Sequence, residues 1–173
     1  MLSSMTPAYF QHLARYNAWA NRRLYAVAET LTTEALALPR PAAFFRSIIG
    51  TLNHLLVGDR IWMHRFEDGG PTHSRLDDEP FPRLCDLKAA REVEDERIVA
   101  YAKNLTVERL AAPFSYRSIG GFPQQQPLWQ ALAHFFNHQT HHRGQAHALL
   151  KDAGKQPPPL DLVLFQRDEA KAG

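Results

Sequence analysis

Histidines gather in one stretch of the chain, His134 to His147, which holds five of the nine histidines. If residues 127–153 form one helix, each residue is rotated about 100° from the one before it. His142 then lies about 40° from His138, and both fall within the apolar stripe of that helix. Two imidazoles one turn apart can direct ring nitrogens at the same cation, as in His-x-x-x-His zinc sites. The spacing therefore indicates a metal site.

The same spacing has a second explanation that needs no metal. Buried imidazoles have lost water as a hydrogen-bond partner, so the pair could share one internal water or bracket a carboxylate. His134 and His141 lie on the flank of the same face, about 40° and about 60° from His138, and are reserve ligands. His147 lies on the opposite side, which predicts a solvated surface residue.

A third histidine, His54, lies in another predicted helix, over about residues 44–67. It is more than about 100° from the centre of the apolar stripe of that helix, which predicts an edge or surface position. Gly50 and Gly58 lie about 40° to either side of it. Glycine inside a helix costs about 1 kcal/mol relative to alanine. The two glycines therefore indicate either that a group needs the space beside His54 or that two helices pack closely.

Histidines that hold a metal need acceptors for the N–H group on the far side of each ring. Asp59 is the one charged residue in the apolar stripe of its helix, so it is expected to have a partner. Gln145 shares the face of His138, and Asn137 is its chain neighbour. These three residues are the candidates for supporting the histidines.

Four amphipathic helices are expected to position these groups, over about residues 7–30, 44–67, 82–104 and 127–153. Thr6 and Pro7 predict the start of the first, because proline has no N–H to leave unpaired there. Asp68 to Pro71 predicts the turn that ends the second. The charged run 91–97 predicts a solvated face of the third helix, with Val93 pointing inward beside Leu87 and Ile98.

The connections between these helices differ in character. Residues 69–82 are polar and contain prolines, which predicts a crossover loop of about a dozen residues. Residues 113–123 turn at Gly120-Gly121 and predict a small hairpin or extended loop that could cover a site. Gly154 predicts the end of the last helix. Beyond it an extended tail is expected, with the apolar residues 160–165 docked on the helices.

Length and composition bound the class of protein. The 173 residues are 45% hydrophobic and 22% charged, which is typical of one globular domain spanning the whole chain. The 20 Lys and Arg residues nearly balance 18 Asp and Glu residues and form no basic stripe, so no nucleic-acid partner is expected. The lone Cys85 forms no internal disulfide. Neither a signal peptide nor a membrane span is recognisable, which predicts a cytoplasmic protein.

Three segments resemble the DinB/YfiT-like superfamily of metal-dependent enzymes: Tyr16 to Asn21, Ser47 to Trp62 and Asn137 to Gln145. The resemblance implies an all-α, up-down-down-up four-helix bundle with a long crossover between helices two and three, often as a homodimer. It implies a divalent metal held by His54, His138 and His142, which overrides the surface position predicted for His54. The superfamily includes thiol S-transferases and thiol-dependent isomerases that act on small molecules.

Three nitrogen ligands leave a coordination position open, the pattern of a catalytic metal site. Zinc or nickel is expected there, and manganese and iron also accept imidazole. Transfer of a low-molecular-weight thiol to an electrophile is the first hypothesis. Metal-assisted hydrolysis is the second, weakened because no H-E-x-x-H motif supplies a general base. The third is a bundle that binds a metal or ligand without catalysis.

Overall fold

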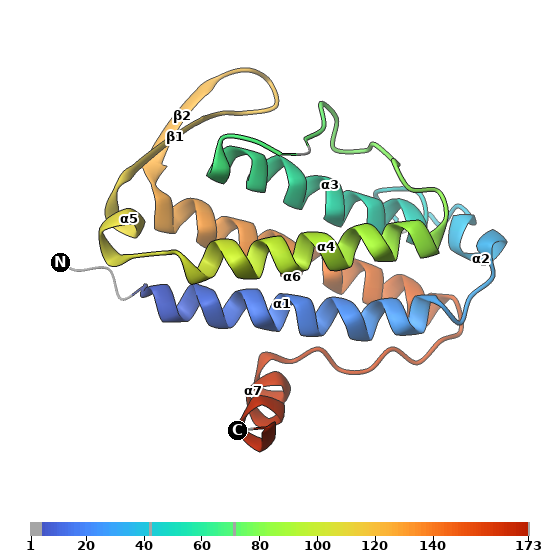
Figure 1. Cartoon of the computed structure of the whole chain (residues 1–173). Helices are drawn as coiled ribbons and strands as arrows, with labels where there is room; N and C mark the ends of the chain where they lie inside the picture. Colours follow the sequence, from blue (N-terminus) through green and yellow to red (C-terminus); the bar gives the residue numbers. More distant parts are fainter. Residues whose placement is uncertain (1–4, 42, 71, 173) are drawn as a thin grey trace.

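The structure is a computed structural model that describes residues 5–41, 43–70 and 72–172. Pro71, in the turn predicted after the second helix, lies outside the described residues, as do residues 1–4. The chain is mostly helical with one small two-stranded sheet. The four long helices in Figure 1 are α1 (Pro7–Ala28), α3 (Ile48–Glu67), α4 (Leu84–Lys103) and α6 (Leu128–Asp152).

These helices match the four predicted from periodicity, with ends that differ by a few residues. Helix α1 starts where Thr6 accepts a hydrogen bond from the Tyr9 amide. Helix α3 starts four residues later than predicted, because the Ser47 hydroxyl accepts the Gly50 amide at 3.0 Å and caps the helix there. It ends at Asp68, whose φ of 53° is left-handed. Helices α1 and α3 each pack against both α4 and α6.

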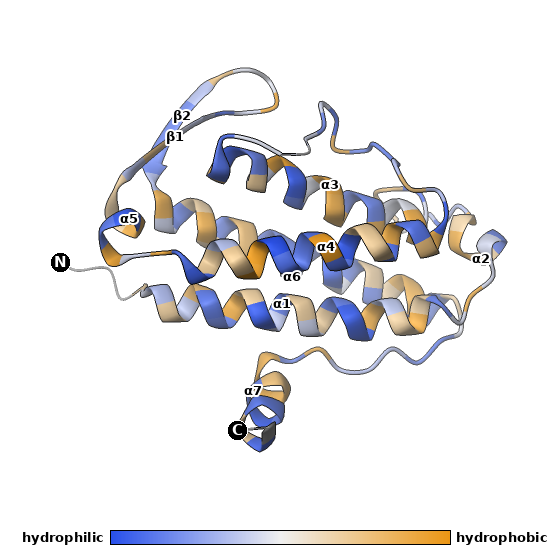
Figure 2. Ribbon diagram, viewed as in Figure 1, coloured by the Kyte–Doolittle hydropathy of each residue, from blue (hydrophilic) through white to orange (hydrophobic). Residues whose placement is uncertain are grey.

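The side chains packed between the four long helices form three layers. One apolar cluster includes Phe66 and Phe135, and a second, toward the opposite end of every long helix, includes Leu24 and Leu150. Between them each long helix contributes buried polar side chains, so hydrophilic residues interrupt the helices near their middles (Figure 2). We call these residues the polar layer; they are Asn17, Asn21, Asp59, Arg91, Asp95, Gln139 and Arg143.

The polar layer corrects the prediction for the charged run on α4. Arg91, Glu94 and Asp95 are buried, whereas Val93 is 65% exposed. Arg91 donates to Asp59 at 2.5 Å and is paired with Asp95 at 3.1 Å. Burial of these charges is tolerated because they pair with one another. The prediction is therefore wrong for these three charged residues and for Val93, whereas Glu92 and Glu96 are exposed as predicted.

The shorter elements lie at the ends of the long helices. Helix α2 (Thr33–Ala37) precedes α3, and α5 (Val107–Ala111) precedes the hairpin. Strands β1 (Pro113–Arg117) and β2 (Pro123–Pro127) pair antiparallel, with Ser115 opposite Gln125. The hairpin predicted here is confirmed, and Gly121 adopts the positive φ of 82° in its turn.

The end of the chain differs from the extended tail that was predicted. Residues after Gly154 are extended as far as Asp161, but helix α7 (Leu162–Ala172) follows. The tail docks as expected: Phe165 is buried against Tyr16, whose hydroxyl donates to the Leu160 carbonyl at 2.6 Å. His147 is half-buried rather than solvated, because its Nε2 lies 3.2 Å from the Pro158 carbonyl oxygen of this tail.

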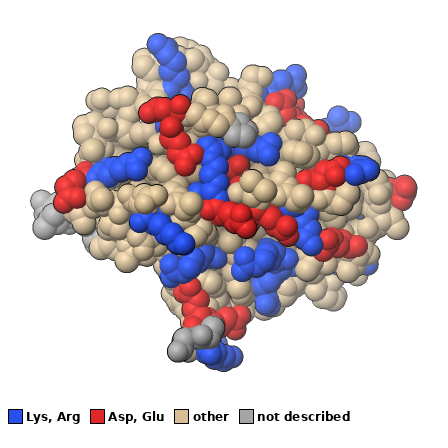
Figure 3. Space-filling model, viewed as in Figure 1, with Lys and Arg blue, Asp and Glu red and all other residues tan. Residues whose placement is uncertain are grey.

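Charges of both signs are interspersed on the face shown in Figure 3. In the described part of the chain, no helix has the length and apolar character that crossing a membrane requires.

Candidate metal centre

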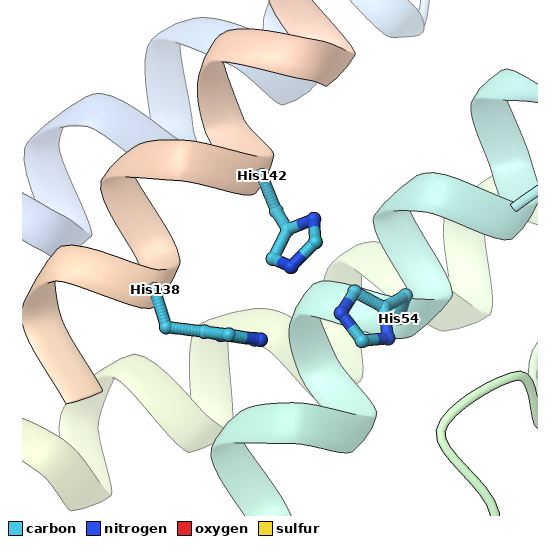
Figure 4. A group of neighbouring side chains, drawn as sticks. All are labelled: His54, His138 and His142. Atoms are coloured by element: carbon cyan, nitrogen blue, oxygen red, sulfur yellow. The ribbon is translucent and has the colours of Figure 1, made fainter. Parts of the chain in front are cut away.

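His54 from α3 and His138 and His142 from α6 come together between the two helices. One ring nitrogen from each lies within 4.8 Å of the others. The ring centres are 4.3 Å apart for His54 and His142 and 4.4 Å apart for His138 and His142. Figure 4 shows the three rings pointing toward a shared space. The pair predicted on one helix is thus completed by a third histidine from another.

His54 is buried, with only 2% of its surface exposed. Its Nδ1 lies 2.7 Å from the Leu76 carbonyl oxygen, which can only accept, so Nδ1 carries the proton and Nε2 the lone pair. The Phe45 ring stacks on the imidazole at 3.6 Å. Burial lowers the pKa of His54 to about 4. The ring is therefore neutral and held in one orientation.

The two histidines of α6 are also neutral. Burial lowers the pKa of His138 to about 3, with repulsion from His142 and His54 adding to the effect. Burial likewise lowers the pKa of His142. His142 Nδ1 lies 2.7 Å from the Gln145 side-chain oxygen and donates to it. Only neutral imidazole can bind a metal, so all three rings are in the competent form at neutral pH.

The unpaired nitrogens of the cluster test whether it fits a metal ion. His54 Nε2 and His138 Nδ1 are buried and have no hydrogen-bond partner among the described residues. Each unpaired buried polar atom costs about 1–3 kcal/mol. Carbonyl or amide acceptors already fix the far nitrogens of His54 and His142, as they do around protein-bound metals. The three histidines are therefore placed to bind a divalent metal ion.

The glycines of α3 allow neighbouring groups to approach the helix closely. A Cβ atom on Gly58 would lie 3.0 Å from His138 Cε1, so this glycine admits the His138 ring across the helix interface. A Cβ on Gly50 would lie 2.2 Å from the Phe45 carbonyl oxygen. The space beside His54 itself is filled by the Phe45 ring. Gly58 therefore fits the second of the two expectations, close packing of two helices, and Gly50 accommodates the loop that precedes α3.

The other predicted residues are divided between the centre and its surroundings. Gln145 supports His142, as described above. Asp59 instead faces the polar layer, where it accepts from Arg91 and, at 2.7 Å, from the Gln139 side-chain amide. Burial raises the pKa of Asp59 to about 6, and Arg91 opposes this effect. Asn137 is exposed on α6.

The reserve ligands lie beside the cluster rather than in it. His134 is exposed, and its ring centre is 5.9 Å from that of His138 and 5.1 Å from that of Trp62. His141 is exposed, and its ring centre is 4.8 Å from that of His142. Sequence reasoning missed Phe45 and the Leu76 carbonyl, because a stacking partner and a backbone acceptor from connecting loops carry no motif.

Two adjoining cavities lie beside the cluster, and His138 is the one of its three histidines that lines either of them. The inner cavity, of about 330 Å³, is lined by α3, α6 and the hairpin, including Gly58, Trp62, Tyr116 and His138. The outer cavity, of about 510 Å³, lies between the end of α3, the crossover loop and the hairpin. The two share Tyr116 and Ile119, so they form one cleft. The hairpin thus forms part of its wall, in keeping with the predicted cover.

The sequence model of the DinB family matches residues 1–172. The chain belongs to the DinB family. A curated relative, Protein DinB of Bacillus subtilis (strain 168), is 27% identical, and the match covers 92% of this chain and 96% of the relative. The crystal structure of a DinB-like protein from Bacillus cereus ATCC 10987 has the same fold, with a TM-score of 0.66 at 20% identity. That match covers 92% of this chain and 99% of the other.

Membership in the DinB family confirms the resemblance inferred from the three sequence segments. The two predictions for His54 had disagreed: helical periodicity placed it at the surface, whereas the family resemblance made it a metal ligand. The buried position of His54 agrees with the resemblance. Periodicity misplaced this residue because nearly every side chain of α3 is buried, so the helix has no solvent face there.

Proposed function

We propose that this DinB-family protein is a metal-dependent enzyme that transfers a low-molecular-weight thiol to a small electrophile. The observation that carries the proposal is a set of three neutral imidazoles, two of them with unpaired buried nitrogens, beside an open cleft that His138 lines. Three protein ligands leave room for a substrate atom. A structural site would instead be closed by protein on all sides.

A divalent ion, with zinc and nickel the first candidates, would supply Lewis acidity that lowers the pKa of a thiol from about 8.5 and favours the thiolate. The reaction then balances simply. The sulfur forms a bond to an electrophilic carbon, and the bond from that carbon to its leaving group breaks with the electron pair. The thiol proton passes to solvent water.

The lining of the inner cavity favours thiol transfer over hydrolysis. None of its described residues is Asp or Glu, so no carboxylate stands ready to deprotonate water. A thiol needs less help, since its ordinary pKa is far below that of water. Cys85 is exposed at the start of α4 and is not among the residues that line the cleft, so the reacting thiol would come from the substrate.

The proposal includes the up-down-down-up bundle and the homodimer typical of the family. In Figure 1, the chain runs in one direction through α1 and α6 and in the opposite direction through α3 and α4, which supports this arrangement. Sedimentation equilibrium would test the dimer.

Elemental analysis and turnover together test the function. We expect one divalent metal per chain in the wild type and loss of it in His54→Ala, His138→Ala and His142→Ala. Metal-loaded protein should accelerate the reaction of 2-mercaptoethanol with 1-chloro-2,4-dinitrobenzene, and Cys85→Ser should keep that activity. Full metal content in all three variants would show that these histidines do not bind the metal, and the proposed metal centre would be refuted.

A second assay separates the competing functions. Turnover of p-nitrophenyl acetate without any thiol would favour hydrolysis. If a broad screen of thiols and electrophiles gave no rate above the metal-stripped control, thiol transfer would be abandoned.

A further inference from the structure

One side chain sets the charge of the inner cavity. Arg65, in the last turn of α3, lines it together with Trp62, Tyr116 and His138. It is the only residue of formal charge among the described residues that line this cavity, since His134 is held neutral there. The cavity beside the histidines is thus apolar and aromatic with a single positive charge.

The guanidinium of Arg65 has no anionic partner in the part of the chain that the structure describes. It lies 4.7 Å from the centre of the Trp62 ring and 5.0 Å from that of Tyr116. No hydrogen bond or ion pair joins it to a described residue. By contrast, Arg97 and Arg91 on α4 each lie within 2.7 Å of a carboxylate oxygen. A half-buried guanidinium that lacks a counter-ion leaves its N–H donors available to a ligand.

Arg65 also stands where the two cavities join, because it lines both. The outer cavity carries charges of both signs, Arg117 and Asp68. Arg117 donates to the Gly121 carbonyl oxygen of its own hairpin, and Asp68 is not within ion-pair distance of Arg65. A molecule that reached His138 through the cleft would therefore pass an unpaired guanidinium packed against two aromatic rings.

We propose that Arg65 binds a carboxylate of the substrate, while the apolar part of that molecule packs on Trp62 and Tyr116. The planar guanidinium offers parallel N–H donors that match a carboxylate, and its packing against two rings limits its motion. The proposal rests on the proposed function for the reaction and deepens it by naming the substrate class. That class is small organic acids with an aromatic or apolar body.

The test uses metal-free protein, so that a carboxylate cannot bind through the metal. Calorimetric titration would compare 3-phenylpropionate with the neutral 3-phenylpropan-1-ol, which has the same carbon skeleton. We expect the acid to bind about tenfold more tightly, as a charge-assisted hydrogen bond in a partly exposed site predicts. Equal binding of the two probes, or no measurable binding of the acid, would overturn the proposal.

Variants assign any preference to Arg65. Arg65→Gln should lose the preference for the acid, and Arg65→Lys should keep part of it. Arg109→Gln is the matched control, because Arg109 also lies over an aromatic ring, 5.1 Å from the centre of Tyr101, but does not line the cleft. It should bind as the wild type does. Persistence of the preference in Arg65→Gln, with the variant shown to be folded by circular dichroism, would refute the assignment.

The binding result and the reaction can fail separately. The titrations need neither metal nor turnover, so the absence of thiol transfer would not contradict carboxylate binding by Arg65. Conversely, loss of the acid preference with thiol transfer intact would remove only the substrate class.

Discussion

Replacing Gly58 with alanine should weaken metal binding without weakening the helix. The added Cβ would lie 3.0 Å from His138 Cε1, whereas ordinary contacts of this kind are 3.4–4 Å. The imidazole must therefore move by a few tenths of an ångström. Bond lengths at a metal site tolerate deviations of only about 0.2 Å. The displacement is larger than that tolerance, so His138 would no longer be a good ligand.

The expected size of the effect follows from comparable perturbations. Disturbing the support of one ligand typically costs about 10–100-fold in metal affinity. The backbone effect has the opposite sign, because alanine is favoured over glycine inside a helix by about 0.5–1 kcal/mol. In the metal-free protein this raises the melting temperature by about 1–4 °C at most, less whatever the contact with His138 costs.

Gly144→Ala is the matched control for this experiment. Gly144 lies inside α6, and its added Cβ would meet nothing within 4 Å. It should gain the same helix stability and keep wild-type affinity for metal. Affinity would be measured by competition with a chromogenic zinc chelator, and stability by melting the chelated proteins. Equal zinc affinity in Gly58→Ala and Gly144→Ala would refute the role of Gly58.

Three further predictions concern stability. Chelation should lower the melting temperature but leave the helical circular dichroism spectrum in place, because the two apolar clusters do not depend on the metal centre; a random-coil spectrum would show that the metal is structural. In the metal-free protein, the pKa values of His54 and His138 are lowered to about 4 and about 3, so the unfolded chain binds protons first and stability falls as pH drops below about 6.5. The urea midpoint should therefore be lower at pH 5 than at pH 7, and less so in His138→Gln; an unchanged midpoint would contradict this. Arg91→Met leaves Asp59 buried without its cation and should cost about 3–5 kcal/mol in urea unfolding, whereas Lys88→Met at the surface pair with Glu29 should cost under about 1 kcal/mol. Similar losses in the two variants would contradict the distinction.

Helical periodicity correctly predicted the four long helices and the convergence of His138 and His142. It wrongly predicted that the charged residues of α4 in the polar layer are solvated. His138 and His142 are one turn apart on one helix, so their convergence is a local property that spacing reveals. The run 91–97 on α4 is also local, but its burial depends on Asp59 from α3 and on the polar residues of α1. Charges that pair across helices cannot be told from solvated charges by their spacing on one helix.

Local residue patterns were enough to predict the four long helices, the hairpin, the pair His138 and His142 and, through three segments, the family. Each of these depends on residues close together in the chain. Contacts with other parts of the chain established what helical spacing missed: that His54 is buried, that Phe45 stacks on it and that the Leu76 carbonyl fixes its proton. They also established that Gly58 admits His138 and that Arg65 stands unpaired beside the cluster. The physical reason is that burial and pairing are properties of two surfaces in contact, and the second surface comes from a distant part of the chain.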